Sequence, residues 1–307
     1  MTDIKKIFIH DSEFPLIDSN DVLVGYQTKY PELDPAYIAT HCGKSRQETK
    51  QWLESLWIKY QPYAEPGFLF SLRKKGGFHS FSWQMYLANV FLDKEFELKP
   101  NTGTGPDIQL VMDNRIFWIE AIVTTPGKDE STSGMPADGD IYKSLDPRVA
   151  RISNALMSKY EKYKEKYLNK ICKSDEPLIV AINGTNTQTM FGGRAIEATV
   201  FARGNDLFTR NANGSLKGGQ YELREKVFIN KNGRNVEVAT NYFYNDSFKE
   251  LSAAIYCEQH IINANNFGRT PEGNLFLATN GYAFNPVGSF NVGNLIERLP
   301  DGGIIHK

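Results

Sequence analysis

Two carboxylates near the middle of the chain stand beside apolar stretches where apolar residues would be expected. Asp107 precedes the first stretch and Glu120 lies in the second, and the dipeptide Asp113-Asn114 separates the two. Asn and Asp tolerate the positive φ of a two-residue hairpin turn. Counted outward from such a turn, Asp107 lies opposite Glu120, and directly opposed Cβ atoms are roughly 4.5 to 5.5 Å apart on one face. A slip of one residue would place the two acids on opposite faces.

Two like charges at that distance need a compensating partner. A divalent metal ion, a shared proton, or an arginine or lysine side chain would each serve. The alternative is an ordinary pair of solvated charges at the edge of a hairpin. The residue types therefore point to metal or acid–base chemistry, and the elements around the hairpin must position it.

The stretches on either side predict those elements. Apolar residues at helical spacing predict a helix over 78–94, and "EFELKP" predicts a short strand before the hairpin. A polar Gly/Ser-rich loop is expected over 128–140, and then a long amphipathic helix over 146–173, with Pro147 in its first turn. "PLIVAIN" predicts a buried strand. Further strands are predicted as a hairpin within 221–244 and as single strands at 251–257 and 274–280.

The segment "GPDI", followed on the next strand by "EAI", resembles the motif of the PD-(D/E)XK nuclease superfamily. The resemblance covers residues 78 to 185, with the helix, hairpin, helix and strand in the same order. It implies a restriction-endonuclease-like α/β fold, a mixed β-sheet core flanked by helices, that hydrolyses DNA with a divalent metal. Asp107 and Glu120 would then hold Mg²⁺ or Mn²⁺, helped by a backbone carbonyl near Ala121.

The chain departs from the family pattern at two positions. The lysine that the family carries two residues after the acid is Ile122 here, and isoleucine can neither orient water nor stabilise charge. The acid often found on the upstream helix is Gln84, which can ligate a metal through its carbonyl oxygen without carrying charge. Three cations of the long helix could replace the lysine or contact nucleic acid, unless they form a solvated helix face: Arg148, Arg151 and Lys159. Lys159 is assigned to catalysis and Arg151 to nucleic-acid contact.

Residues 37–53 resemble a helix-turn-helix. Small residues and Gly43 would allow two helices to cross closely, and the second helix would present Lys44, Arg46 and Lys50 to DNA. The alternative is an ordinary helical hairpin packed on the main domain. The expected organisation is a helical N-terminal region over 1–75 and a nuclease-like α/β domain over 76–307.

Bulk composition and charge limit the classes of protein to which this chain can belong. The 307 residues carry a formal net charge of −1, so no global basic field attracts nucleic acid, and any such site must be local. Three scattered cysteines favour a reducing compartment, and the absence of long apolar runs argues against a signal peptide or a membrane span. We expect a soluble cytoplasmic protein whose partners are DNA and a second copy of the chain as a homodimer, with no membrane partner.

The leading hypothesis is a metal-dependent endonuclease acting on DNA. The rival is a degenerate nuclease-fold module that binds nucleic acid or a protein without cleavage, and a third class is a structural protein with no nucleic-acid role. Asp107→Asn and Glu120→Gln should each abolish cleavage. Their thermal midpoints should be unchanged or higher, because facing carboxylates repel each other when no metal is present.

Overall fold

The computed structural model describes residues 6–8, 16, 20–124, 145–184, 193–210, 216–231, 234–259, 275–299 and 303–307. These residues fall into two compact units: the first comprises the described residues up to Ile116 together with Gln259, and the second comprises those from Phe117 to Glu258 and from 275 onward. The polar loop expected over 128–140 lies outside the described residues.

The first unit is mainly helical. Its α-helices are α1 (Asn20–Lys29), α2 (Pro35–Cys42), α3 (Gln47–Tyr60), α4 (Phe68–Arg73) and α5 (Phe78–Asp93), with short 3₁₀ turns η1 (Lys44–Arg46) and η2 (Gln61–Tyr63). Helix α5 is buried continuously from Ser82 to Phe91, as expected of a helix that is apolar on most sides. Both α3 and α4 pack against it, so α5 is the centre of this unit's core.

Two short strands complete the first unit. Strand β1 (Glu97–Lys99) pairs antiparallel with β2 (Ile108–Met112), and Leu98 lies opposite Leu110. Asp113 and Asn114 follow with φ values of 52° and 59°, as a type I′ hairpin turn requires. The next strand, β3, begins directly after them at Arg115. The predicted two-residue turn is therefore confirmed.

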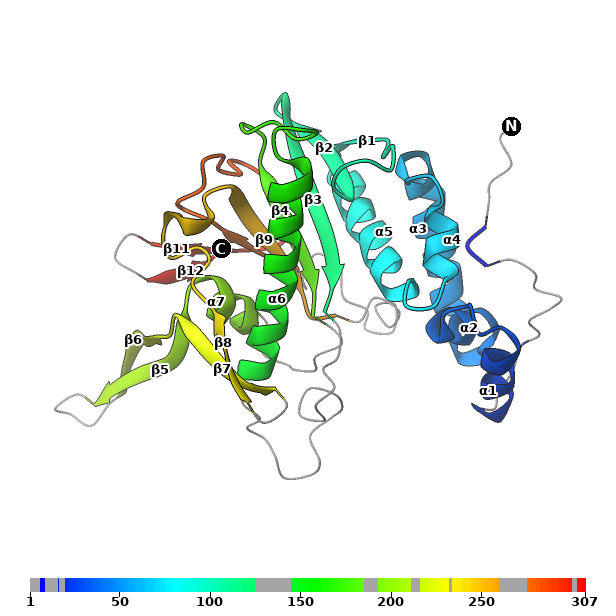
Figure 1. Ribbon diagram of the computed structural model, residues 1–307, viewed down its shortest axis with the longest axis horizontal. Helices are drawn as coiled ribbons and strands as arrows, with labels where there is room; N and C mark the ends of the chain where they lie inside the picture. The colour runs from blue at the N-terminus through cyan, green and yellow to red at the C-terminus, as the bar shows by residue number, and fades with distance from the viewer. Residues whose placement is uncertain are drawn as a thin grey trace. The chain divides into compact units, whose positions relative to one another are not determined.

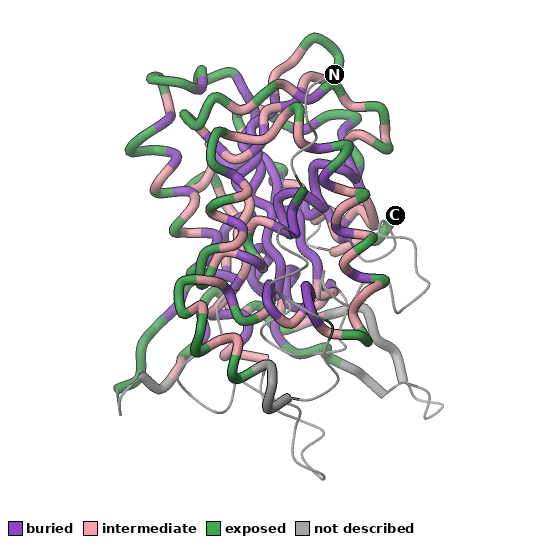
Figure 2. The backbone as a smooth tube through the Cα atoms, turned by 90° about the vertical axis from the view of Figure 1, so that its right-hand side faces the viewer, coloured by how far each residue is buried: buried purple, intermediate pink, exposed green. Residues whose placement is uncertain are grey.

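The second unit is built on a mixed sheet. Strands β3 (Arg115–Val123), β4 (Leu178–Asn183), β9 (Leu251–Cys257), β10 (Leu275–Thr279), β11 (Asn294–Arg298) and β12 (Ile304–His306) lie side by side in that order. The pairs β3–β4, β4–β9 and β10–β11 are parallel, whereas β9–β10 and β11–β12 are antiparallel. Every residue of β4 and β9 is buried, within the purple interior of Figure 2. The chain is thus of the mixed α/β class, as predicted.

Helix α6 (Asp146–Lys162) connects β3 to β4 and packs against β4 (Figure 1). The stripe that makes it amphipathic is buried, from Val149 through Ile152 and Leu156 to Tyr160. The predicted helix over 146–173 was too long. The α-helix ends at Lys162, and a π-helical turn η3 (Tyr163–Tyr167) and a turn that closes on Cys172 follow. Hydrogen bonds from three successive amides to the carbonyl of Tyr167 replace the continued helix.

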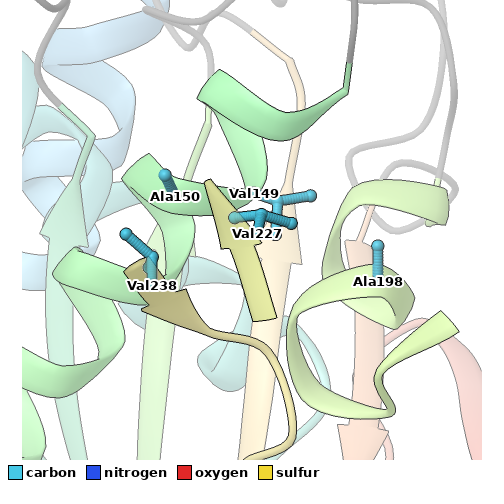
Figure 3. Close-up of a cluster of buried hydrophobic side chains, with 5 residues drawn as sticks. All are labelled: Val149, Ala150, Ala198, Val227 and Val238. Carbon is cyan, nitrogen blue, oxygen red and sulfur yellow. The ribbon is translucent and has the colours of Figure 1, made fainter. Parts of the chain in front are cut away.

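Two two-stranded ribbons and one more helix belong to the second unit. Strands β5 (Arg203–Arg210) and β6 (Leu216–Leu223) form a ribbon that the sequence did not reveal, because the polar stretch "RGNDLFTR" has no apolar alternation. Strands β7 (Lys226–Lys231) and β8 (Arg234–Ala239) form the second ribbon, as predicted. Helix α7 (Arg194–Val200) joins α6 and this ribbon in one small core (Figure 3), whose members are Val149, Ala150, Ala198, Val227 and Val238.

Candidate active site

Glu120 is a carboxylate in the interior of the second unit. It lies in the middle of β3 opposite Val180 of β4, and its side chain is 0% exposed. A buried charge of this kind costs several kcal/mol unless ionic partners and hydrogen bonds compensate it. Glu120 is therefore a residue that the surrounding elements must support.

Two lysines from α6 provide that support. Lys159 Nζ donates a hydrogen bond to Glu120 Oε2, and Lys162 Nζ lies 3.0 Å from Oε1 and 3.3 Å from Oε2. Residues three apart on a helix share one face, which explains why both ammonium groups reach the same carboxylate. The lysine side chains are 14% and 34% exposed, respectively.

The sequence identified one of these two lysines. Lys159 was a candidate replacement for the lysine missing at position 122, and the structure places it on Glu120 rather than on a solvated helix face. Lys162 was missed, although its spacing from Lys159 was a usable signal. Ile122 follows Glu120 by two residues in β3, so the two side chains point to the same face of the sheet.

The neighbouring Cys172 is not a candidate nucleophile. Its side chain is 1% exposed. Burial, with the carboxylates of Glu176 and Glu120 nearby, raises the pKa of the Cys172 thiol to about 12. It therefore stays a protonated thiol at neutral pH.

Gln84 and Asp107 come together in the first unit. Gln84 is 5% exposed on α5, and its Nε2 donates to the backbone carbonyl of Asp107 and to the Tyr60 hydroxyl, both at 3.0 Å. Asn101 Nδ2 donates to the same Asp107 carbonyl at 2.9 Å. These bonds hold the backbone just before β2. Both of the hydrogen bonds from Gln84 use its amide nitrogen. Its amide oxygen is therefore the atom that could coordinate a cation.

Asp107 and Glu120 belong to different units, so their facing arrangement stays a prediction of the hairpin count. The same applies to a metal ion held between them with the carbonyl near Ala121. Ala121 itself lies opposite Ala181 in the β3–β4 pair. Within the residues that the structure describes, no three or more His, Cys, Asp or Glu side chains gather as a metal-binding group.

The predicted nucleic-acid contacts lie on α6 and near the start of α3. Arg151 is half-buried on α6. Lys44 is exposed and Arg46 is half-buried, whereas Lys50 contacts His41 Nδ1 at 3.2 Å and lies 5.7 Å above the centre of the Phe8 ring. One side of α3 is buried through Thr49, Leu53, Trp57 and Tyr60. Helices α2 and α3 thus form a helical hairpin packed on α5, and DNA reading by its outer face stays a prediction.

Comparison with protein-family models, curated proteins and solved structures found no match for this chain. A search of the described helices found none long and apolar enough to cross a membrane. The geometry of Glu120 and its two lysines therefore carries the functional argument.

Proposed function

We propose that this chain is a metal-dependent endonuclease that hydrolyses DNA phosphodiester bonds in the cytoplasm. The observation that supports this most is the buried Glu120 on β3 with Lys159 reaching it from α6. An acid and a lysine are the pair that the PD-(D/E)XK motif places two residues apart on one strand. In this chain the lysine comes from the helix that follows the strand.

The resemblance to the PD-(D/E)XK superfamily implies a small hard cation. Mg²⁺ is usually bound by one or two carboxylates, with waters and substrate phosphate oxygens completing its shell. Glu120 and, by the hairpin count, Asp107 would hold Mg²⁺ or Mn²⁺, with the Gln84 amide oxygen and a carbonyl near Ala121 as neutral donors. The bound ion would polarise the scissile phosphate and lower the pKa of the attacking water.

The chain's own residues would do the remaining work. The Lys159 side chain is 14% exposed and its ammonium contacts Glu120, where it would stabilise negative charge that develops on the phosphate. The amides of Gln84 and Asn101 fix the backbone at Asp107, which limits the positions that its carboxylate can reach. Both effects are preorganisation of groups before the substrate arrives.

A specific observation favours a second candidate function. Both carboxylate oxygens of Glu120 already accept hydrogen bonds from lysines, so its charge is balanced by the protein alone. A nuclease-fold module that binds nucleic acid or a protein without cutting would need no metal ion to neutralise Glu120.

The test is cleavage of plasmid, linear duplex and single-stranded DNA by the purified chain, with Mg²⁺, with Mn²⁺ and with a chelator. We expect metal-dependent cleavage that Glu120→Gln abolishes and Lys159→Met lowers by about 10²-fold or more. Lys226→Met is the matched control, because it removes an exposed lysine of β7 that pairs with Glu237. It should cleave like the wild type.

A rescue experiment sharpens the test. Ile122→Lys in the Lys159→Met background restores a lysine on the face that carries Glu120, so cleavage should return in part. Absence of cleavage in every variant, together with no thermal shift on adding metal, would rule out the nuclease. DNA binding unaffected by metal would then favour the module without catalysis.

A further inference from the structure

The segment 6–8 is buried in the helical first unit without belonging to a helix or a strand, and it is drawn in dark blue near α4 in Figure 1. Ile7 is 0% exposed and Phe8 is 2% exposed, whereas Lys6 is exposed. A buried segment outside regular secondary structure must satisfy its backbone groups through other parts of the chain. The groups that do so define the site that receives it.

Two charged side chains hold the backbone of this segment. Glu54 of α3 accepts hydrogen bonds from two successive amides, from Ile7 at Oε2 (3.2 Å) and from Phe8 at Oε1 (2.9 Å). Arg73, the last residue of α4, donates from Nε to the Ile7 carbonyl at 2.9 Å and from Nη2 to the Lys6 carbonyl at 2.6 Å. Hydrogen bonds to ionised groups are stronger than those between neutral groups, and these four involve only the backbone of the segment.

The ring of Phe8 adds contacts that depend on its side chain. It stacks on the ring of Tyr37, with centroids 5.2 Å apart, and meets the ring of Phe78 edge-on at 6.2 Å. The His41 ring lies 5.4 Å from it, and the Lys50 ammonium lies 5.7 Å from its centre. Peptide-binding proteins commonly gain affinity from hydrogen bonds to the backbone of a peptide and specificity from pockets for its side chains. This part of the helical unit combines both.

The charged groups that hold the segment serve it rather than the helices. In the part of the chain that the structure describes, the side-chain hydrogen bonds of Glu54 and Arg73 go to residues 6–8 alone. Helices α2, α3 and α4 pack against α5 through contacts of their own. Release of the segment would therefore break no helix and no strand of the unit.

We propose that this part of the helical unit is a binding site for an extended peptide in which an aliphatic residue precedes an aromatic one. Residues 6–8 occupy it in cis, and the same residues of a second copy of the chain can occupy it instead. The second copy fits because its segment has the identical sequence and makes the same contacts, as in domain swapping. Within one chain the tether favours the cis arrangement, since a short linker gives an effective concentration in the mM range.

Two complementary variants test the exchange. Ile7→Ala/Phe8→Ala keeps the site but removes the side chains of the segment. Glu54→Gln/Arg73→Met keeps the segment but removes the groups that hold it, because glutamine offers one acceptor oxygen to two amides and methionine offers no donor. An equimolar mixture should form a one-to-one dimer by size-exclusion chromatography with light scattering, whereas each variant alone stays monomeric.

The matched control for the mixture is Glu48→Gln, which changes an exposed acid of the same helix. Its own segment still fills its site, so it should form no dimer with Ile7→Ala/Phe8→Ala. A dimer of equal amount in this control would overturn the proposal, because the association would then not require a released segment.

A fluorescent peptide of residues 4–11 probes the site by itself. By anisotropy it should bind Ile7→Ala/Phe8→Ala at least about tenfold more tightly than it binds the wild type, where the tethered segment competes. The same peptide with alanine in place of Ile7 and Phe8 should not bind. Peptide binding without dimer formation in the mixture would exclude the second copy as the occupant, and the absence of both in folded variants would exclude the site.

Hydrogen exchange of the wild type tests the proposal even if Ile7→Ala/Phe8→Ala does not fold. A segment that leaves its site opens locally, so the amides of Ile7 and Phe8 should exchange at least about tenfold faster than the slowest amides of α5. Exchange of these two amides only through global unfolding would show that the segment is a fixed part of the core, and would overturn the proposal.

Discussion

Glu120 is a charged residue in a strand whose neighbours are almost all apolar, and its tolerance there depends on groups that lie far away in the chain. Lys159 and Lys162 are separated from it by 39 and 42 residues. The hairpin count alone suggested that removing the charge would leave stability unchanged or raise it, through relief of repulsion from Asp107. The two ion pairs reverse this expectation: removing the charge of Glu120 should lower the stability of the protein.

Glu120→Gln should therefore destabilise the metal-free protein, by about 1 to 3 kcal/mol, because two partly buried ammonium groups lose their carboxylate. Urea unfolding in the presence of a chelator measures this. Asp107→Asn, in the first unit, is the comparison. An unchanged or higher midpoint for Glu120→Gln would mean that the lysines contribute nothing to folding.

The cysteines allow a second prediction at this scale. Cys42, Cys172 and Cys257 are all buried, and burial raises the thiol pKa of Cys42 and of Cys172, the latter to about 12. At pH 8 almost none of either thiol is ionised, so a disulfide reagent should react slowly with the native protein. After denaturation the same reagent should react with all three thiols. A thiol that reacts within seconds in the native state would contradict this burial.

At the scale of elements, the hairpin turn shows how local chemistry determines structure. Asn114 has a φ of 59°, a conformation that costs most residues roughly 1 to 2 kcal/mol but glycine very little. Asn114→Gly should leave stability unchanged or raise it slightly, whereas Asn114→Val should lower it by about 1 to 2 kcal/mol. Chemical denaturation of both variants measures the difference, and equal stabilities would argue against the type I′ turn.

The helical hairpin of α2 and α3 gives a prediction that separates folding from DNA contact. Lys50 contacts His41 and lies over Phe8, whereas Lys44 is exposed. Lys50→Met should lower stability by about 0.5 to 1 kcal/mol, through the lost cation–π contact, and leave DNA affinity unchanged. Lys44→Met should leave stability unchanged. A marked loss of DNA affinity in Lys50→Met at constant stability would instead support the helix-turn-helix hypothesis.

Over the whole molecule, charge limits the strength of any nucleic-acid binding. The formal net charge is −1, so attraction to DNA must come from local groups such as the lysines at the end of α6. We expect about three phosphate contacts or fewer, and hence a slope of log affinity against log salt no steeper than about −3. Fluorescence anisotropy of labelled duplex DNA over a salt series, with a chelator present, measures the slope. A much steeper slope would require a basic surface that the lysine cluster does not supply.

Short-range patterns determined much of this architecture. The turn at Asp113-Asn114, the buried strands β4 and β9 and the amphipathic start of α6 all follow from residue types within a few positions of one another. The α/β class follows from the order of these elements. Glu120 was conspicuous in the sequence because a carboxylate interrupted an apolar strand.

Tertiary structure alone decided which partners meet. The choice of Lys159 and Lys162 as the partners of Glu120 depends on how α6 packs against β4, the neighbour of β3, which no local pattern encodes. The β5–β6 ribbon, polar at its start, is held by ladder pairing between separate strands. Each of these depends on contacts between distant residues, where packing and pairing override local propensity.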